Sequence, residues 1–360
     1  MLRRTTFLLT TKQPRLSPPL KRTNKPFPSL PSLPNNTSLR TNKNIHCKQP
    51  LKMPTETFNY GEEHALQTVT VTTLSETLDK KFWIILIHGG AWRDPKIDAI
   101  NFSNPAISKL TTSPKYADVL PHITAFASIS YRLSPHPDHP QDQSSTNPRD
   151  YRGSKHPDHI NDVQAAIAFL QRKYGFEERY ILVGHSCGAM LAYQSVMGQF
   201  KAGISHGPVA VAGLAGIYDL KKFRDTHKEI PAYQEIVEGA FGDDEAAWDA
   251  VSPAVVKGAD GIEGGWTHGS FAILAHSSDD SLVDETQDEA MDAALIGGWW
   301  KLQSEDKLRC VTRMPLEGEH DECWEKGDGL AEVIGYAIEK QLEITYEEEP
   351  EEPEESKSPV

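Results

Sequence analysis

The sequence predicts an α/β fold in which a mostly parallel central sheet carries helices on both faces. Short apolar segments alternate with helical patterns through residues 53–346, which favours parallel strands joined by helices. One segment, Phe82–Ile87, is apolar without interruption, as expected of a strand that is buried on both faces. No apolar run approaches the ~18 residues that a membrane-spanning helix requires, so we expect no membrane partner.

The elements are expected in a simple alternating order. Strands are predicted at 68–73, 82–87, 123–131, 180–183, 208–215, 271–275 and 308–314, the first being an alternating edge strand. Helices are predicted at 160–174, 189–197, 285–296 and 329–341. Two long segments, 135–157 and 219–269, show no regular pattern. Loops of that length usually form lids or binding elements, so we expect an insert or lid at about 219–269.

Both ends of the chain differ in composition from the folded domain, which we place at 53–346. Residues 1–50 contain ten Lys or Arg, eight Pro and no acidic residue, and we expect 1–52 to be disordered. This segment is either an organelle transit peptide or sequence upstream of a true start at Met53. The second interpretation predicts a cytoplasmic protein, and a genuine transit peptide would make it mitochondrial. Residues 347–360, with seven Glu, are expected to form an acidic disordered tail.

Charge and cysteine content exclude several classes of protein. Residues 51–346 carry a net charge of about −18, which repels phosphate backbones and argues against a nucleic-acid partner. The four cysteines show neither paired metal-ligand spacing nor the density of a secreted disulfide framework. They fit a reducing compartment.

A serine in a Gly-x-Ser-x-Gly pattern is the first candidate for chemistry, in the GHSCG segment at 184–188. The buried strand Tyr180–Val183 leads straight into it, and a helical segment rich in small and apolar residues follows. Such a strand-to-helix turn holds a nucleophile in a strained, exposed conformation and needs small flanking residues. We therefore expect Ser186 to be a nucleophile. The competing interpretation is a glycine-rich turn with an ordinary capping serine.

A second glycine-containing segment, HGGAW at 88–92, directly follows the most apolar strand. Consecutive glycines let the backbone approach a reacting carbonyl and direct amide groups at its oxygen. We expect the amides of Gly89, Gly90 and Cys187 to form an oxyanion hole, and His88 to anchor the loop by a hydrogen bond. A flexible turn beside a partly buried tryptophan is the alternative.

A serine nucleophile needs a base and an orienting acid, expected in the order serine, acid, histidine. Only one histidine lies beyond His276, namely His320, in the loop after the last predicted strand. The acid should lie in the loop after the preceding strand, where Asp279, Asp280 and Asp284 compete. Asp280 is favoured by its spacing from His276 and by the Leu-Val pair that follows.

Two further histidine signals are weaker. The tetrapeptide HPDH occurs at 136–139 and again at 156–159, but no other ligand lies at a consistent spacing. A turn before a helix that begins at Pro157 explains the second copy better, because proline suits the first helical position. His185 should point away from Ser186 and be structural. We expect neither a metal nor a cofactor.

Six segments together resemble the α/β-hydrolase superfamily, within its HGGxW branch, and most closely the fungal kynurenine formamidases, or arylformamidases. They span about 240 residues in the expected order: HGGAWRDP at 88–95, SYRLSPHP at 130–137, HPDHINDVQAAIAFL at 156–170, VGHSCGAM at 183–190, HSSDDSLV at 276–283 and GEHDECW at 318–324. The motif residues are His88, Gly89, Gly90, Ala91 and Trp92, with alanine at the third position of the glycine run.

The resemblance implies Ser186, Asp280 and His320 as catalytic residues, and hydrolysis of N-formyl-L-kynurenine to L-kynurenine and formate in tryptophan catabolism. The partner is then a small molecule, and Trp92 is expected to line its aromatic part. A homodimer is compatible with the sequence. The glycine motifs alone would also suit a hormone-sensitive-lipase-like carboxylesterase, and a third alternative is an inactive hydrolase fold used for binding.

Overall fold

The computed structural model describes residues 53–75, 81–303 and 308–348. The predicted basic segment 1–52 and the tail from residue 349 onward lie outside the described residues. The last helix continues to Glu348 and therefore extends past the predicted end of the folded domain at 346. None of the described helices is long and apolar enough to cross a bilayer.

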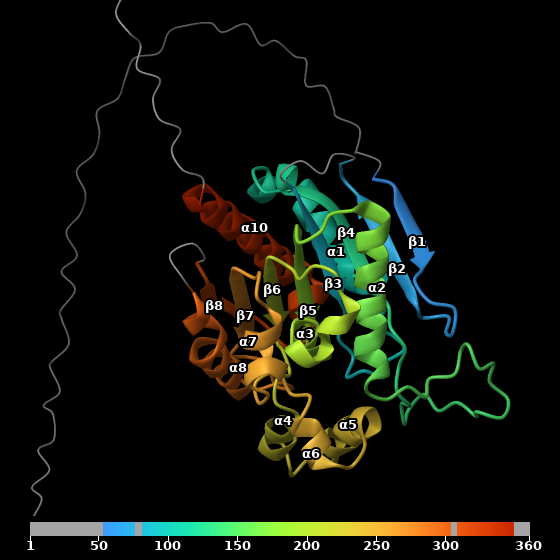
Figure 1. The fold of residues 1–360 in the computed structure, drawn as a ribbon. Helices are drawn as coiled ribbons and strands as arrows, with labels where there is room; N and C mark the ends of the chain where they lie inside the picture. The colour runs from blue at the N-terminus through green and yellow to red at the C-terminus, as the bar shows by residue number, and fades with distance from the viewer. Residues whose placement is uncertain (1–52, 76–80, 304–307, 349–360) are drawn as a thin grey trace, which may run out of the picture. The chain divides into compact units, whose positions relative to one another are not determined.

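In the described part of the chain, eight strands form one sheet, in the order β1-β2-β4-β3-β5-β6-β7-β8 (Figure 1). Within the described residues, β2 is antiparallel to both of its neighbours and every other neighbouring pair is parallel. The strands are β1 (Thr55–Asn59), β2 (Thr68–Thr73), β3 (Phe82–Ile87), β4 (Ile123–Ile129), β5 (Tyr180–His185), β6 (Ala210–Leu214), β7 (Phe271–Ser277) and β8 (Cys310–Leu316). The predicted mostly parallel sheet is therefore confirmed.

Helices cover both faces of the sheet, as predicted. The α-helices are α1 (Ala99–Thr112), α2 (Asp158–Tyr174), α3 (Cys187–Gln194), α4 (Leu220–Thr226), α5 (Pro231–Phe241), α6 (Glu245–Asp249), α7 (Ile262–Gly265), α8 (Thr286–Gly297), α9 (Glu322–Glu325) and α10 (Asp328–Glu348). Residues 53–75, 81–303 and 308–348 also contain five short 3₁₀ helices: η1 (Pro114–Tyr116), η2 (Leu120–His122), η3 (Gly198–Gly203), η4 (Gly258–Asp260) and η5 (Trp299–Leu302).

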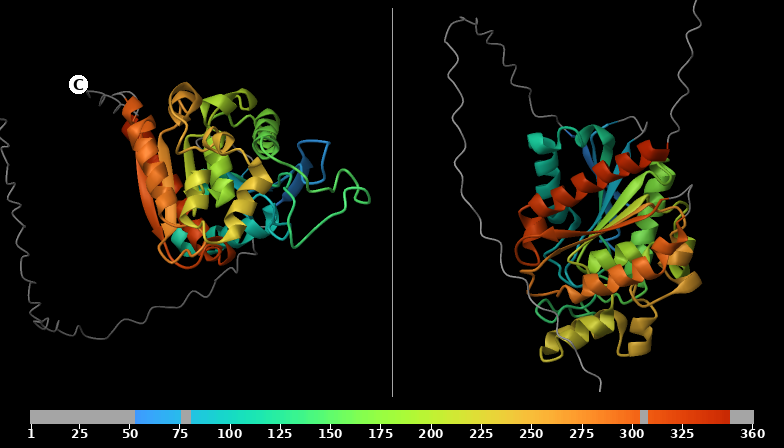
Figure 2. Two further views of the ribbon diagram at one scale, coloured as in Figure 1. Left: turned by 90° about the horizontal axis from the view of Figure 1, so that it is seen from below. Right: turned by 90° about the vertical axis from the view of Figure 1, so that its left-hand side faces the viewer.

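Two hydrophobic cores lie on the two faces of the sheet. Along β3, Ile84 and Leu86 join the core that contains α1 and α10, whereas Ile85 and Ile87 join the core that contains α2, α3 and α8. Figure 2 shows these helical layers on either side of the strands. The uninterrupted apolar character of β3 follows from this burial on both faces.

Strand β1 and helix α1 are among the elements that were not predicted from the sequence. Strand β1 is short, polar and exposed, so it lacks an apolar alternation. Helix α1 contains Pro105 and several polar residues, which obscure its pattern. It begins with a capping box in which Asp98 accepts the amides of Ile100 and Asn101, and it buries Phe102 against the sheet.

The predicted insert at 219–269 is largely helical rather than irregular. It contains α4, α5, α6 and α7, of which three have five to eleven residues and one has four. Asp219 and Asp244 cap α4 and α6 with their side chains, and these short capped turns leave little periodicity in the sequence. Helices α4, α5 and α6 lie together beyond one end of the strands (Figure 1). The other long segment, 135–157, has no helix or strand, as predicted.

Candidate active site

The predicted site residues follow the carboxyl ends of parallel strands. The HGGAW loop follows β3, Ser186 follows β5, Asp280 follows β7 and His320 follows β8. Because these strands run in the same direction, their carboxyl ends meet at one edge of the sheet. The fold therefore brings together residues that are far apart in the sequence.

Ser186 occupies a sharp turn between β5 and α3. Its backbone angles are φ 54° and ψ −122°, a strained conformation for a residue with a side chain. The turn is closely packed, because a Cβ at Gly184 would overlap the carbonyl of Gly188, and one at Gly188 would overlap the carbonyls that end β3. The nucleophile interpretation predicts a strained turn of this kind, and Ser186 lacks the side-chain cap that an ordinary capping serine would make.

His320 and Asp280 are paired directly. His320 donates Nδ1–H to Oδ2 of Asp280 across 2.8 Å, and the Asp280 side chain is 1% exposed. Oδ1 of Asp280 accepts the amides of Leu282 and Val283, each at 2.9 Å. Burial alone would raise the pKa of Asp280, but His320 and these amides together hold the pKa below its ordinary value. The Asp280 carboxylate is therefore ionised and fixed behind the imidazole.

The two competing aspartates take other partners. Asp279 is exposed, and its amide donates to Ser277 Oγ. Asp284 lies 3.2 Å from Nε2 of His227, in the insert. Of the three aspartates, Asp280 is the one that contacts His320, and the amides of the Leu-Val pair that follows hold its carboxylate.

The HGGAW loop is held by polar contacts on several sides. His88 bonds the Gly89 carbonyl through Nδ1 at 2.9 Å and stacks on Tyr131, whose hydroxyl donates to the carbonyls of His88 and Gly89. Burial lowers the pKa of His88 to about 4, so this ring is neutral. His88 is thus tied to the loop by a hydrogen bond and by its stacking on Tyr131.

Three consecutive residues of this loop have positive φ: Gly90 at 95°, Ala91 at 50° and Trp92 at 59°. No hydrogen bond joins the amide of Gly90 or Cys187 to another described residue, so both can donate to a ligand. A Cβ at Gly89 would lie 3.1 Å from Cβ of Ser186, which shows how closely the loop approaches the nucleophile. The amides of Gly89, Gly90 and Cys187 remain the candidate oxyanion hole.

The side chain of Cys187 has a role that the sequence did not reveal. Its Sγ accepts the amide of Trp92 at 3.2 Å and lies 3.6 Å from the Tyr131 hydroxyl. Burial raises the pKa of the thiol to about 11, so it is protonated at neutral pH. Cys187 therefore connects the helix behind the nucleophile to the loop that would hold the oxyanion.

The structure corrects the expectation that Trp92 lines the substrate pocket. Trp92 is fully buried, packs edge-on against Phe241 and does not line the cavity at Ser186. The positive φ values turn its ring into the core, and Arg93 lines the cavity instead.

A cavity of about 170 Å³ lies at Ser186 and His320. Its other walls include Phe223 from α4 and Ile236 from α5, so the insert covers the candidate nucleophile. The role of the 219–269 segment as a lid stays a prediction. No hydrogen bond joins Ser186 to His320 within the described residues, although both border this cavity.

His185 lies directly beside His320 rather than in a remote part of the core. It is fully buried, its ring centroid is 4.6 Å from that of His320, and its Nε2 is 3.0 Å from the His320 carbonyl oxygen. Burial lowers its pKa well below the ordinary value. The predicted structural role is borne out, and it extends to the backbone of the candidate base.

A second buried pair lies behind Asp280. Nε2 of His276 donates to the Val283 carbonyl at 2.8 Å and is 3.6 Å from Oδ2 of Asp280. Nδ1 of His276 is 3.2 Å from Oδ1 of Asp288, whose side chain is 1% exposed. Burial alone would lower the pKa of His276, but contact with Asp288 and its charge raise it above the ordinary value.

One group of potential metal ligands occurs among the described residues: His185, His320 and Asp321, with ligand atoms within 4.8 Å of one another. One ring nitrogen of each histidine already contacts a protein oxygen, so the group reflects the packing of His320 over His185. The two HPDH segments do not form one cluster, because His159 is buried against Ser134 while the other copy lies at the surface.

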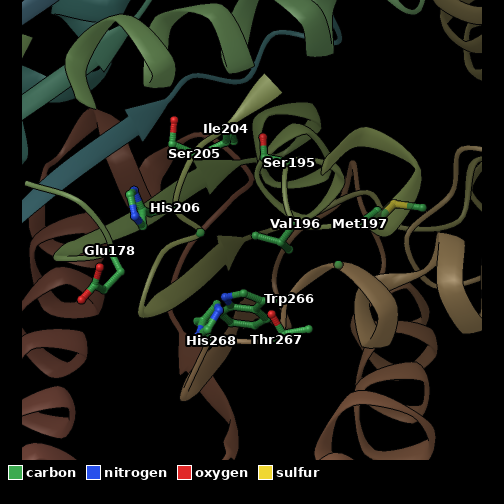
Figure 3. A pocket seen from close by; sticks show the side chains of 12 residues that line it. Glu178, Ser195, Val196, Met197, Ile204, Ser205, His206, Trp266, Thr267 and His268 are labelled. Carbon is green, nitrogen blue, oxygen red and sulfur yellow. The ribbon is translucent and has the colours of Figure 1, made fainter. Parts of the chain in front are cut away.

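A larger cavity, of about 470 Å³, lies away from these residues (Figure 3). Its lining includes Glu178, His206 and His268, which precede β5, β6 and β7. It therefore lies at the amino ends of the strands, opposite the edge that carries Ser186. The smaller cavity is the candidate active site because the paired His320 and the strained serine border it.

Comparison with known proteins identifies relatives and structural neighbours. No family model matches the chain. The chain is 40% identical over 259 residues to a kynurenine formamidase-like hydrolase of Fusarium equiseti, covering 71% of this chain and 83% of that protein. It is 35% identical over 288 residues to a kynurenine formamidase of Aspergillus versicolor, covering 74% and 92%.

Solved structures with the same fold are more distant in sequence. Esterase B of Lactobacillus rhamnosis has a TM-score of 0.56 at 16% identity, covering 83% of this chain and 91% of that chain. A truncated carbohydrate esterase from gut microbiota has a TM-score of 0.51 at 17% identity, covering 80% and 96%. These neighbours show the α/β-hydrolase fold.

Proposed function

The chain belongs to the kynurenine formamidase family of α/β-hydrolases, and from this premise we propose that it hydrolyses N-formyl-L-kynurenine to L-kynurenine and formate with Ser186 as nucleophile. The observation that carries the proposal is the ionised, buried Asp280 paired at 2.8 Å with His320, which shares a cavity with the strained Ser186. The order of Ser186, Asp280 and His320 along the chain, and their positions in loops after β5, β7 and β8, are typical of serine hydrolases of this fold.

In the first half of the reaction, Ser186 Oγ attacks the formyl carbon while Nε2 of His320 takes its proton. Asp280 accepts from Nδ1 of His320, which fixes the ring orientation and stabilises the imidazolium that forms. The amides of Gly89, Gly90 and Cys187 donate to the tetrahedral oxygen. The amino end of α3, which begins at Cys187, adds a favourable dipole for that negative charge.

The C–N bond then breaks as His320 returns the proton to the arylamine nitrogen, and the amine product leaves. This leaves a formyl ester on Ser186. A water molecule, deprotonated by His320, attacks the ester carbonyl, and the same oxyanion donors stabilise the second intermediate. Formate departs, Ser186 recovers its proton from His320, and no cofactor enters either step.

The small size of the cavity supports a short acyl group. Phe223 and Ile236 from the insert leave a cavity of about 170 Å³ at the nucleophile. Overfilling such a site costs about 1–3 kcal/mol, or roughly ten- to a hundredfold in rate. We therefore expect kcat/KM for N-formyl-L-kynurenine to exceed that for p-nitrophenyl butyrate by about tenfold or more. Faster turnover of butyrate or longer esters would identify a carboxylesterase instead.

Substitutions test the roles of the proposed catalytic residues independently of the substrate preference. Ser186→Ala, His320→Ala and Asp280→Asn should each lower kcat by roughly a thousandfold or more, and combined variants should lose little beyond that. Asp279→Asn is the matched control, because Asp279 is exposed and does not contact His320. Near-normal turnover by Ser186→Ala would exclude a serine mechanism, and a larger loss in Asp279→Asn than in Asp280→Asn would reassign the acid.

A further inference from the structure

Arg93 occupies the boundary between two adjoining cavities. It lines the cavity at Ser186 and also a neighbouring cavity of about 380 Å³. His136 lines both cavities as well, so these two residues connect them. A substrate whose formyl group lies at Ser186 can extend past Arg93 into the second space.

The Arg93 side chain is shielded and only partly engaged. It is 11% exposed and donates one N–H, from a terminal nitrogen, to Oε1 of Glu235 at 2.7 Å. No other described residue accepts a hydrogen bond from its guanidinium. A guanidinium carries five N–H donors in a planar fork that matches a carboxylate, so Arg93 has donors left for a ligand.

Glu235, the partner of Arg93 in this ion pair, can also accept hydrogen bonds from a ligand. It belongs to α5 of the insert, and its side chain is 54% exposed. Within the described residues its carboxylate accepts from Arg93 alone. Two other acids near Ser186 have local partners along the chain, since Asp94 accepts the Lys96 amide and Asp321 accepts from the indole of Trp324, whereas Glu235 contacts Arg93 itself.

Arg93 and Glu235 both line the neighbouring cavity of about 380 Å³. This adjacent cation and anion complement a molecule that carries a carboxylate and an ammonium group on one carbon. The amino-acid end of N-formyl-L-kynurenine is such a zwitterion, whereas its reacting formamide is neutral. Among the residues that line the Ser186 cavity, Arg93 is the only lysine or arginine. The wall therefore offers one permanent positive charge for the carboxylate.

We propose that Arg93 binds the substrate's α-carboxylate and that Glu235 meets its α-ammonium. The proposal rests on the function proposed above. In the empty site the two residues pair with each other, which holds α5 against the oxyanion loop. On binding, the carboxylate takes the free donors of Arg93 in a bidentate contact, and the ammonium lies against Glu235. The pair thus selects α-amino acids over simple aryl formamides.

The test compares two substrates in one variant. N-formyl-L-kynurenine is measured beside 2-formamidoacetophenone, which keeps the formamide, ring and ketone but lacks the amino-acid end. Arg93→Met should raise KM for N-formyl-L-kynurenine by roughly ten- to a hundredfold, because a charged hydrogen-bond partner is lost. Its kcat/KM for 2-formamidoacetophenone should change by less than about threefold, which also shows that the variant is folded.

Two further variants separate binding from structural support. Arg224→Met removes an arginine of α4, in the insert that also carries Glu235; Arg224 pairs with Glu245 at 2.6 Å and is 14% exposed, but it does not line the Ser186 cavity. It should leave the ratio of the two substrates unchanged. The charge swap Arg93→Glu with Glu235→Arg should recover the melting temperature without recovering KM.

An equal loss on both substrates in Arg93→Met, or full recovery of KM in the swap, would overturn the assignment and make the pair structural. Failure of the proposed function looks different, since the unmutated enzyme would then hydrolyse neither formamide.

Discussion

His185 donates its Nε2–H to the carbonyl oxygen of His320 across 3.0 Å, so the residue before the candidate nucleophile holds the backbone of the candidate base. A carbonyl oxygen only accepts, which places the proton on Nε2. Because burial keeps the pKa of His185 low, the ring is neutral and its Nδ1 carries a lone pair. That nitrogen faces Gly89, where a Cβ would lie 2.6 Å away. The buried ring of His185 thus contacts the backbone of His320 and also the HGGAW loop at 88–92.

The first prediction concerns this contact. His185→Leu removes the donor, whereas His185→Gln keeps an N–H of similar reach. We expect kcat of the Leu variant to be about tenfold below that of the Gln variant, with similar KM, since a hydrogen bond of this kind contributes about 1–1.5 kcal/mol. Steady-state kinetics and the rate of labelling by a fluorophosphonate measure it. Equal kcat in both variants would mean that His185 acts only by filling space.

The second prediction concerns the thiol of Cys187. Cys187→Ala leaves the buried amide of Trp92 without an acceptor, which should cost about 1–3 kcal/mol of unfolding free energy. The oxyanion loop should also lose its positive-φ geometry, and kcat should fall by about tenfold or more. Cys310→Ala on β8 is the control, because Cys310 is partly exposed and far along the chain from this loop. Comparable losses in both variants would contradict the argument.

The third prediction concerns pH and the His276–Asp288 pair. A histidine with a raised pKa adds stability below its unfolded pKa of about 6.5, and the gain is lost as pH rises through the higher folded pKa. The reference is a double variant, His276→Gln with Asp288→Asn, which replaces both groups by neutral side chains. The melting-temperature advantage of the native chain should be larger near about pH 6 than near about pH 9. An advantage that grows toward alkaline pH would show that His276 is neutral in the fold.

The fourth prediction contrasts a buried and an exposed ion pair. Arg132 binds both oxygens of Asp162, a side chain that is 2% exposed and also accepts from Gln67. Asp162→Ala should lower the unfolding free energy by about 3–5 kcal/mol, because the cation loses its buried partner. Asp225→Ala removes the 55% exposed partner of Arg224 and should cost less than about 1 kcal/mol. Urea unfolding of both variants measures the difference, and similar values would contradict it.

The sequence predicted the parts of the site that depend on local order along the chain. Ser186, Asp280 and His320 each follow a parallel strand, and the apolar runs of β5 and β7 make the first two of these strands recognisable. Asp280 was separable from Asp279 because the amides of the next residues hold its carboxylate, a contact within three positions.

The parts that the sequence did not predict depend on contacts between distant segments. The thiol of Cys187 meets the Trp92 amide across 95 positions, and Arg93 meets Glu235 across 142. The residues that surround Cys187 or Arg93 in the sequence do not indicate which distant residue will be its partner. Trp92 was assigned wrongly because its direction depends on positive φ values, which L-residues rarely adopt and a motif does not reveal.

The backbone of Ser186 has a consequence for how this chain can change over generations. A side chain at φ 54° costs about 1–3 kcal/mol, while glycine adopts such angles freely and loses only about 0.5–1 kcal/mol of chain entropy. Ser186→Gly should therefore melt no lower than the active protein while losing turnover. Under the proposed function, only selection for the reaction keeps serine at this position, so a descendant that no longer used the candidate nucleophile would gain stability by discarding it.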